Sequence, residues 1–140
     1  MREPLTYAIA HGAAQAALEA ARAEGVRISV AVASRGGIVK VLLSDDGVGP
    51  MGIETARRKA YTAAVTGMPT SRFAQFAASP AMAAASPQQV DPLLLPAPGG
   101  LPISVDDGEV IGGVAVGGAD GETDERIAAA ALASIKDLLA

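Results

Sequence analysis

A dense group of polar side chains is the first candidate for chemistry in this 140-residue chain. It comprises Glu54, Arg57, Arg58, Lys59, Tyr61 and Thr62. Helical spacing predicts that all of these but Arg57 and Lys59 share one side of a helix. Arg58 or Lys59 can clamp a carboxylate, and Tyr61 or Glu54 can act as a general acid or base. The alternative is a solvated helix face with a Glu54–Arg58 ion pair, which would contribute only about 0.3–0.5 kcal/mol.

The single histidine, His11, is the second candidate. A neutral imidazole is a good iron ligand, but one His and no Cys exclude multi-histidine, thiolate and iron–sulfur sites. Its helical neighbours include Tyr7, Gln15 and Arg22, so His11 lies on the polar face of its helix. The alternative is a histidine that faces solvent or contacts another subunit.

Four glycines lie in the last expected strand or directly after it: Gly112, Gly113, Gly117 and Gly118. A missing Cβ lets a helix or a ligand approach the backbone, and close packing against an alanine-rich helix is the simpler explanation. The loop 117–124 can offer N–H groups to an anion. Its acidic residues would repel one, and helix capping explains them more simply. A divalent cation in this loop is a further alternative, but no metal site is predicted.

Paired acids occur twice, at Asp45-Asp46 and at Asp106-Asp107, each pair beside a glycine. Aspartate is favoured in turns because it forms local hydrogen bonds. Acid–base chemistry needs a pKa shifted by burial, and nothing in the sequence predicts burial at either place.

Composition excludes several classes of function. The chain has 11 Lys/Arg against 15 Asp/Glu and a net charge of -4, so nucleic-acid binding is not expected. Half of the residues are apolar, which predicts a folded core. No apolar stretch approaches the about 20 residues of a membrane span. The absence of cysteines and of an apolar leader predicts a cytoplasmic protein.

The hydrophobic pattern predicts a single domain over residues 1–140 that begins with a helix over residues 5–24. Thr6 is its expected N-cap and Gly25 its expected stop. The residues expected on its buried stripe are Leu5, Ile9, Ala13, Ala16 and Ala20.

The remaining elements are expected to form two hairpins and three helices. They are strands 26–33 and 38–43, a helix over about 51–66, a short helix near 73–78, strands 102–105 and 109–116, and a closing helix over 124–139. Strand 26–33 is expected to place Val26, Ile28, Val30 and Val32 on one face. Residues 79–100 contain five of the nine prolines and are expected to be irregular, with a short strand at 93–95. Irregular stretches of this length are usually functional or interface-forming.

Four groups of residues, in this order, resemble the GlcG/HbpS family, which includes the C-terminal domain of PduO-type proteins. They are Val30-Ala31-Val32 with Gly36-Gly37; Asp46-Gly47 with Lys59-Ala60-Tyr61-Thr62-Ala63 and Pro69-Thr70; Pro98-Gly99-Gly100-Leu101-Pro102-Ile103; and Asp107-Gly108-Glu109-Val110-Ile111-Gly112 with Val116-Gly117-Gly118 and Asp124-Glu125. The chain departs from the family's pattern at Ser44-Asp45 and in the longer loop 118–123.

The resemblance implies an α/β (α+β) fold of the profilin-like kind, with a central antiparallel sheet flanked by helices, in a homo-oligomer. Some members bind haem and the family is often labelled haem-degrading. A helix histidine is the axial ligand in some relatives, which implies that role for His11 if a second subunit closes over it. The other expected ligand-binding residues are Arg58, Lys59, Thr62, Gly117 and Gly118.

Three functions therefore remain open. The first is a protein that binds haem or a similar anionic small molecule near a subunit boundary. The second is a metal-free enzyme of the isomerase or lyase type, in which Lys59 orients a small carboxylated metabolite and Tyr61 or Glu54 transfers a proton. The third is a structural or regulatory module that self-associates through its alanine-rich helices and its proline-rich segment.

Overall fold

A single antiparallel sheet forms the centre of the molecule. The computed structural model describes residues 3–106 and 108–139, so Asp107 of the second expected turn lies outside the described residues. The strands are β1 (Ser29–Ser34), β2 (Val39–Ser44), β3 (Gly100–Ser104) and β4 (Val110–Gly117), in the order β2-β1-β4-β3. The two hairpins join through β1 and β4, from the pair Ser29–Gly117 to the pair Ser34–Gly112. The expected fold class, a central antiparallel sheet with helices, is confirmed.

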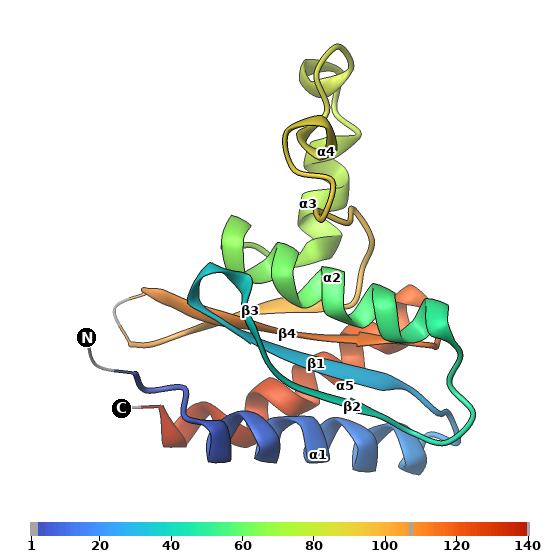
Figure 1. The fold of residues 1–140 in the computed structure, drawn as a ribbon, viewed down its shortest axis with the longest axis vertical. Helices are drawn as coiled ribbons and strands as arrows, with labels where there is room; N and C mark the ends of the chain where they lie inside the picture. Colours follow the sequence, from blue (N-terminus) through green and yellow to red (C-terminus); the bar gives the residue numbers. More distant parts are fainter. Residues whose placement is uncertain (1–2, 107, 140) are drawn as a thin grey trace.

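Helices cover both faces of this sheet (Figure 1). Helices α1 (Tyr7–Ala23) and α5 (Gly121–Ile135) pack on one face, and α2 (Pro50–Thr66) packs on the other. Alternate residues of β1 face the two layers: Val30 and Val32 lie in the core with α1 and α5, and Ala31 lies against α2. The residues expected on one face of this strand, Val26, Ile28, Val30 and Val32, lie in or against the core with α1 and α5. Because helices cover both sides of the sheet, the small residues of the opposite face are buried as well.

The ends of α1 are as expected, but its buried side is not. Thr6 accepts a hydrogen bond from the Ile9 N–H, and Gly25 adopts φ 77° just after the helix. Of the expected stripe only Leu5 and Ala13 are fully buried. The helix instead buries Ala10, Ala13, Ala14, Ala17 and Ala21. Helix α1 packs on both α5 and the sheet. For this reason its buried side is turned about the helix axis relative to the side predicted from the larger apolar residues.

Helix α2 lies directly on the backbone of β4. A Cβ at Gly113 would lie 2.5 Å from the Ala60 carbonyl oxygen, and one at Gly117 would lie 2.3 Å from the Gly52 carbonyl oxygen. Contacts this close exclude any side chain. The predicted packing of glycines against an alanine-rich helix is therefore confirmed.

Between α2 and β3 the chain leaves the sheet and forms a projection, residues 68–95, which we call the arm (Figure 1). It contains α3 (Thr70–Ala77), the 3-10 turn η2 (Pro80–Met82) and the short helix α4 (Pro87–Val90). The strand expected at 93–95 is absent, because side chains of α2, and not a neighbouring strand, bind the backbone there.

The last helix differs in position from its prediction. Helix α5 begins at Gly121 rather than at 124 and is followed by the 3-10 turn η3 (Lys136–Leu138). Its N-cap is Asp120, whose side chain accepts a hydrogen bond from the Thr123 N–H. Helix capping thus accounts for one acid of this loop.

Candidate functional site

The polar side of α2 binds the returning end of the arm. The Arg58 guanidinium donates hydrogen bonds to the carbonyl oxygens of Pro92 at 2.6 Å, Leu93 at 3.2 Å and Leu94 at 3.2 Å. The Thr62 hydroxyl accepts one from the Leu95 N–H at 2.9 Å. These two side chains therefore supply the partners that an irregular backbone otherwise lacks.

Tyr61 is part of the same contact. Its hydroxyl donates a hydrogen bond to the Asp91 carboxylate, and this bond raises the pKa of Tyr61. The Tyr61 ring also lies against the turn before β2, where a Cβ at Gly37 would be 2.3 Å from a ring carbon. Tyr61 thus connects α2 to the arm and to the first hairpin.

Lys59 is buried in an ion pair. Its Nζ lies 3.3 Å from Oδ2 of Asp124, at the start of α5, and donates a hydrogen bond to the Pro98 carbonyl oxygen at 3.0 Å. Both side chains are only 4% exposed. Burial lowers the pKa of Lys59 and raises that of Asp124, although the attraction between them opposes both changes. Gly99 adopts φ 129° here, and a Cβ on it would be 2.4 Å from Nζ, so only glycine fits.

Glu54 lies apart from these contacts. It is exposed and pairs with Arg57, with Nη2 and Oε2 2.5 Å apart. The expected pair with Arg58 is wrong, because the Arg58 guanidinium is turned toward the carbonyl groups of the arm.

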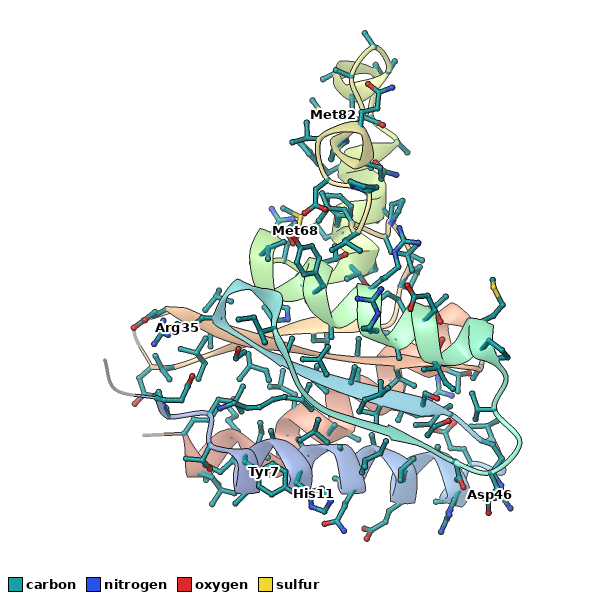
Figure 2. All side chains as sticks on the ribbon, in the orientation of Figure 1. Tyr7, His11, Arg35, Asp46, Met68 and Met82 are labelled. Atoms are coloured by element: carbon teal, nitrogen blue, oxygen red, sulfur yellow. The ribbon has the colours of Figure 1, made fainter. Side chains whose placement is uncertain are left out.

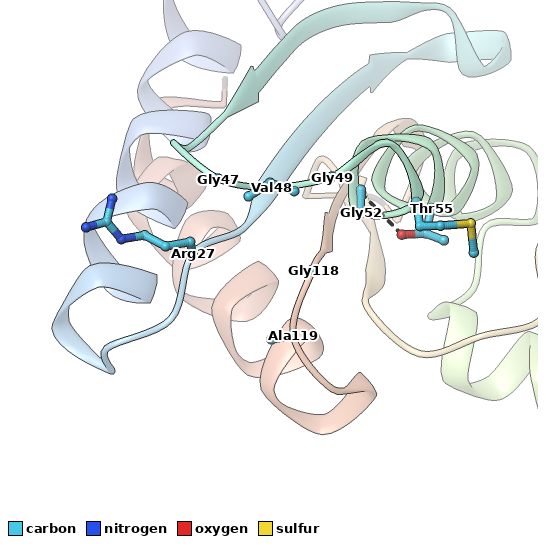
Figure 3. A pocket seen from close by; sticks show the side chains of 9 residues that line it. Arg27, Gly47, Val48, Gly49, Gly52, Thr55, Gly118 and Ala119 are labelled. Atoms are coloured by element: carbon cyan, nitrogen blue, oxygen red, sulfur yellow. Dashed lines mark hydrogen bonds between the residues drawn. The ribbon is translucent and has the colours of Figure 1, made fainter.

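Gly118 borders a cavity of about 410 Å³ at the end of the sheet (Figure 3). The cavity lies between the loop before α2, the first turn of α2 and the start of the loop after β4. Its lining residues are Arg27, Gly47, Val48, Gly49, Met51, Gly52, Thr55, Gly118 and Ala119. Gly117 contacts α2 instead, and no three His, Cys, Asp or Glu side chains gather among residues 3–106 and 108–139 in a way that could hold a metal ion.

His11 lies on the other side of the sheet, on the outer face of α1 (Figure 2). It is half-buried and stacks on the exposed Tyr7, with ring centroids 5.7 Å apart. Its ring nitrogens make no hydrogen bond to any residue that the structure describes. The next residue, Gly12, is exposed, and a Cβ there would meet nothing within 4 Å. The sheet therefore separates His11 from Arg58, Lys59 and Thr62.

Two buried acids were not expected from the sequence. Asp45 receives hydrogen bonds from Nε and Nη2 of Arg22, both at 2.9 Å, and its side chain is 1% exposed. The Arg22 guanidinium holds the pKa of Asp45 well below its usual range. Asp124, assigned to capping, is instead the partner of Lys59. For Asp124 the one available signal was the lack of an acidic partner for Lys59 at three- or four-residue spacing in its own helix.

Together these features define a mixed α/β protein. The polar side chains of α2 are bonded within the chain, and the stacked rings of Tyr7 and His11 on α1 are accessible. Its sequence matches the family described as haem degrading protein HbpS-like over residues 5–133, and the chain belongs to this family.

Solved structures with the same fold support this assignment. A double mutant of HbpS from Streptomyces reticuli is 38% identical with a TM-score of 0.85, over 96% of this chain and 88% of that one. The PduOC:heme complex is 26% identical with a TM-score of 0.84, over 94% of both chains. Klebsiella pneumoniae protein ORFY is 26% identical with a TM-score of 0.83, over 91% of this chain and 88% of that one. A search of curated proteins found no match. None of the described helices is long and apolar enough to cross a membrane.

Proposed function

We propose that this protein binds haem, with His11 as a ligand of the iron, on the outer face of α1. The observation that carries the proposal is the state of His11 in the fold. It is the single imidazole of the chain, it is partly accessible, and neither of its ring nitrogens has a hydrogen-bond partner among the described residues. The family description and the haem in the solved PduOC complex support the same ligand.

The residues beside His11 suit a flat aromatic ligand. Tyr7 is 63% exposed and its ring already stacks on the imidazole, so it offers a planar apolar contact. Gly12 leaves open space on the helix surface, although glycine inside a helix costs about 0.5–1 kcal/mol relative to alanine. Packing within the chain gives no reason for this glycine, but close approach of a ligand does.

When bound, haem would supply an iron centre whose reactivity depends on its axial ligand and its surroundings. The contribution of this chain is to supply the imidazole, to orient it through Tyr7 and to leave room at Gly12. One helix face cannot exclude water from a macrocycle, since cofactor sites bury most of their ligand. The proposal therefore includes a second copy of the chain, which covers the other side of the ligand.

The other hypotheses have less support from the geometry. Arg58, Lys59 and Thr62, expected as ligand contacts, have polar atoms engaged with the arm, with Pro98 and with Asp124. It stays a prediction that these three residues, with Gly117 and Gly118, bind a ligand. It also stays a prediction that Lys59, Tyr61 and Glu54 serve an isomerase or lyase. The single-domain organisation and the cytoplasmic location stay predictions too.

Titration of the apo-protein with hemin tests the proposal. We expect a shifted and sharpened Soret band for the wild type and for Gln75→Ala, a control that changes an exposed residue of α3, away from α1. We expect His11→Ala to lose the shift and at least tenfold in affinity. A wild-type spectrum equal to that of free hemin, or an unchanged spectrum in His11→Ala, would overturn it.

A further inference from the structure

A second cavity lies between the edge strand β3 and helix α5. Its volume is about 390 Å³, and its lining is mostly apolar. The residues that line it include Pro102, Ser104, Leu132, Ala133, Lys136 and Leu139. A mainly apolar cavity of this size with one or two polar groups is typical of a site for a small molecule.

The fold itself keeps this cavity open. Strand β3 is at one edge of the four-stranded sheet and pairs with β4 alone, and Pro102 suits an edge position because proline has no N–H to donate. On the other wall α5 presents the small, exposed side chain of Ala133. Leu139 is 9% exposed and packs in the core with α1 and α5. The walls are therefore formed before any ligand binds, which lowers the entropy cost of binding.

The polar groups of the cavity have no partner among the described residues. Lys136 is exposed and carries the one charge among the described residues that line the cavity. Neither its ammonium group nor the Ser104 hydroxyl makes a hydrogen bond to any residue of 3–106 or 108–139. The other two lysines, Lys40 and Lys59, both donate hydrogen bonds within the chain. Lys136 is therefore the lysine that is available to bind an anion from solution.

We propose that the cavity between β3 and α5 binds a small organic acid with an apolar tail. The carboxylate lies against Lys136, and the tail packs on Pro102 and Leu139. One positive charge matches one carboxylate, whereas an uncharged lipid would leave Lys136 without a partner. A peptide strand added to the edge of β3 would lack a hydrogen-bond donor at Pro102.

This site is separate from the face of α1 that carries His11, because none of the residues that line the cavity belongs to α1. The inference does not depend on haem. Its test uses the apo-protein without hemin, so either proposal can fail while the other holds.

The first test is isothermal titration calorimetry of the apo-protein with octanoate. We expect saturable binding at one site, and about tenfold weaker binding of hexanoate, which buries two fewer CH₂ groups. Ala133→Leu places a larger side chain in the cavity and should weaken octanoate binding at least tenfold. The matched control is Ala130→Leu, the same change at an exposed position of α5 outside the lining, and it should bind as the wild type does. Far-UV circular dichroism checks that both variants are folded.

The second test isolates the contact with the charge. Lys136→Glu should weaken octanoate binding about fivefold and change the affinity for octanol, which has no charge, by less than twofold. The matched control is Arg72→Glu, at an exposed position of α3, which should change neither affinity.

Four results would overturn the proposal. One is the absence of saturable octanoate binding, the result expected if another protein chain fills the cavity. Another is unchanged binding in Ala133→Leu, and a third is an equal loss in Ala130→Leu, since the cavity would then not be the site. The fourth is a loss of octanol binding in Lys136→Glu as large as the loss of octanoate binding, because the carboxylate would then not be recognised.

Discussion

Helices α1 and α2 lie on opposite faces of one sheet and use their polar side chains in opposite ways. On α2, Arg58 and Thr62 bind the arm, and Lys59 binds Asp124. On the outer face of α1, His11 has a stacked ring neighbour but no hydrogen bond among the described residues. The denser polar cluster therefore mainly stabilises the fold, whereas the face of α1 with fewer polar contacts leaves an imidazole accessible.

The largest expected change in stability comes from breaking the buried ion pair between Lys59 of α2 and Asp124 of α5. Lys59→Ala should lower the free energy of unfolding by about 3–5 kcal/mol, because it leaves the Asp124 carboxylate buried without its partner. Lys59→Met combined with Asp124→Leu should recover most of this loss, because no buried charge then remains. His11→Ala should change stability by less than about 0.5 kcal/mol. Urea unfolding measures all three, and equal effects of Lys59→Ala and His11→Ala would remove the contrast between the two helices.

A smaller loss of stability is expected when a hydrogen bond between α2 and the arm is removed. Thr62→Val removes the acceptor for the Leu95 N–H and should cost about 1–3 kcal/mol. The matched control is Thr66→Val on the same helix, whose hydroxyl donates only to the Thr62 carbonyl oxygen and should matter much less. Urea unfolding compares the two variants. A cost for Thr66→Val as large as that for Thr62→Val would show that the arm contact is not the cause.

The stability contributed by the ion pair between Arg22, near the end of α1, and Asp45 should decrease in acid. Because the pKa of Asp45 is lowered in the fold by Arg22, its contribution to stability is present at neutral pH. It is lost as pH falls below the unfolded-state pKa of about 3.9. Asp45→Asn should therefore melt at a lower temperature than the wild type at pH 7, with a difference that shrinks below about pH 4. Melting temperatures between pH 2.5 and 7 test this, and a difference independent of pH would contradict it.

A small gain in stability is expected at Gly12. Gly12→Ala should raise the free energy of unfolding by about 0.5–1 kcal/mol, since the position is exposed and helical. It should also weaken hemin binding if the missing Cβ serves the ligand. Urea unfolding and hemin titration measure the two effects, and unchanged hemin affinity would show that Gly12 does not shape the site.

Local rules predicted the parts of the fold that depend on short segments. The Thr6 cap and the Gly25 stop follow from backbone preferences within a few residues. Both hairpins follow from alternating apolar residues around turn residues. The glycines of β4 indicated close packing, which the contacts of Gly113 and Gly117 with α2 confirm.

The predictions that the structure contradicts concern places where segments far apart in the sequence contact each other. The strand expected at 93–95 is absent because Arg58 and Thr62, more than 30 residues earlier, bind that backbone. The pair expected between Glu54 and Arg58 gave way to the same contact. Burial of Asp45 depends on Arg22 of α1. No spacing rule within one element contains these partners.

Patterning was enough to predict an antiparallel sheet with helices, because it follows from local backbone preferences, and composition alone shows a single imidazole. The family was indicated separately, by the resemblance of four groups of residues in the family's order. The tertiary structure decided which polar groups remain free. It closed the cluster on α2 with the chain's own arm, buried Lys59 against Asp124 and left His11 accessible on α1. A side chain's availability depends on what packs over it, and that is settled only when segments far apart in the chain come together.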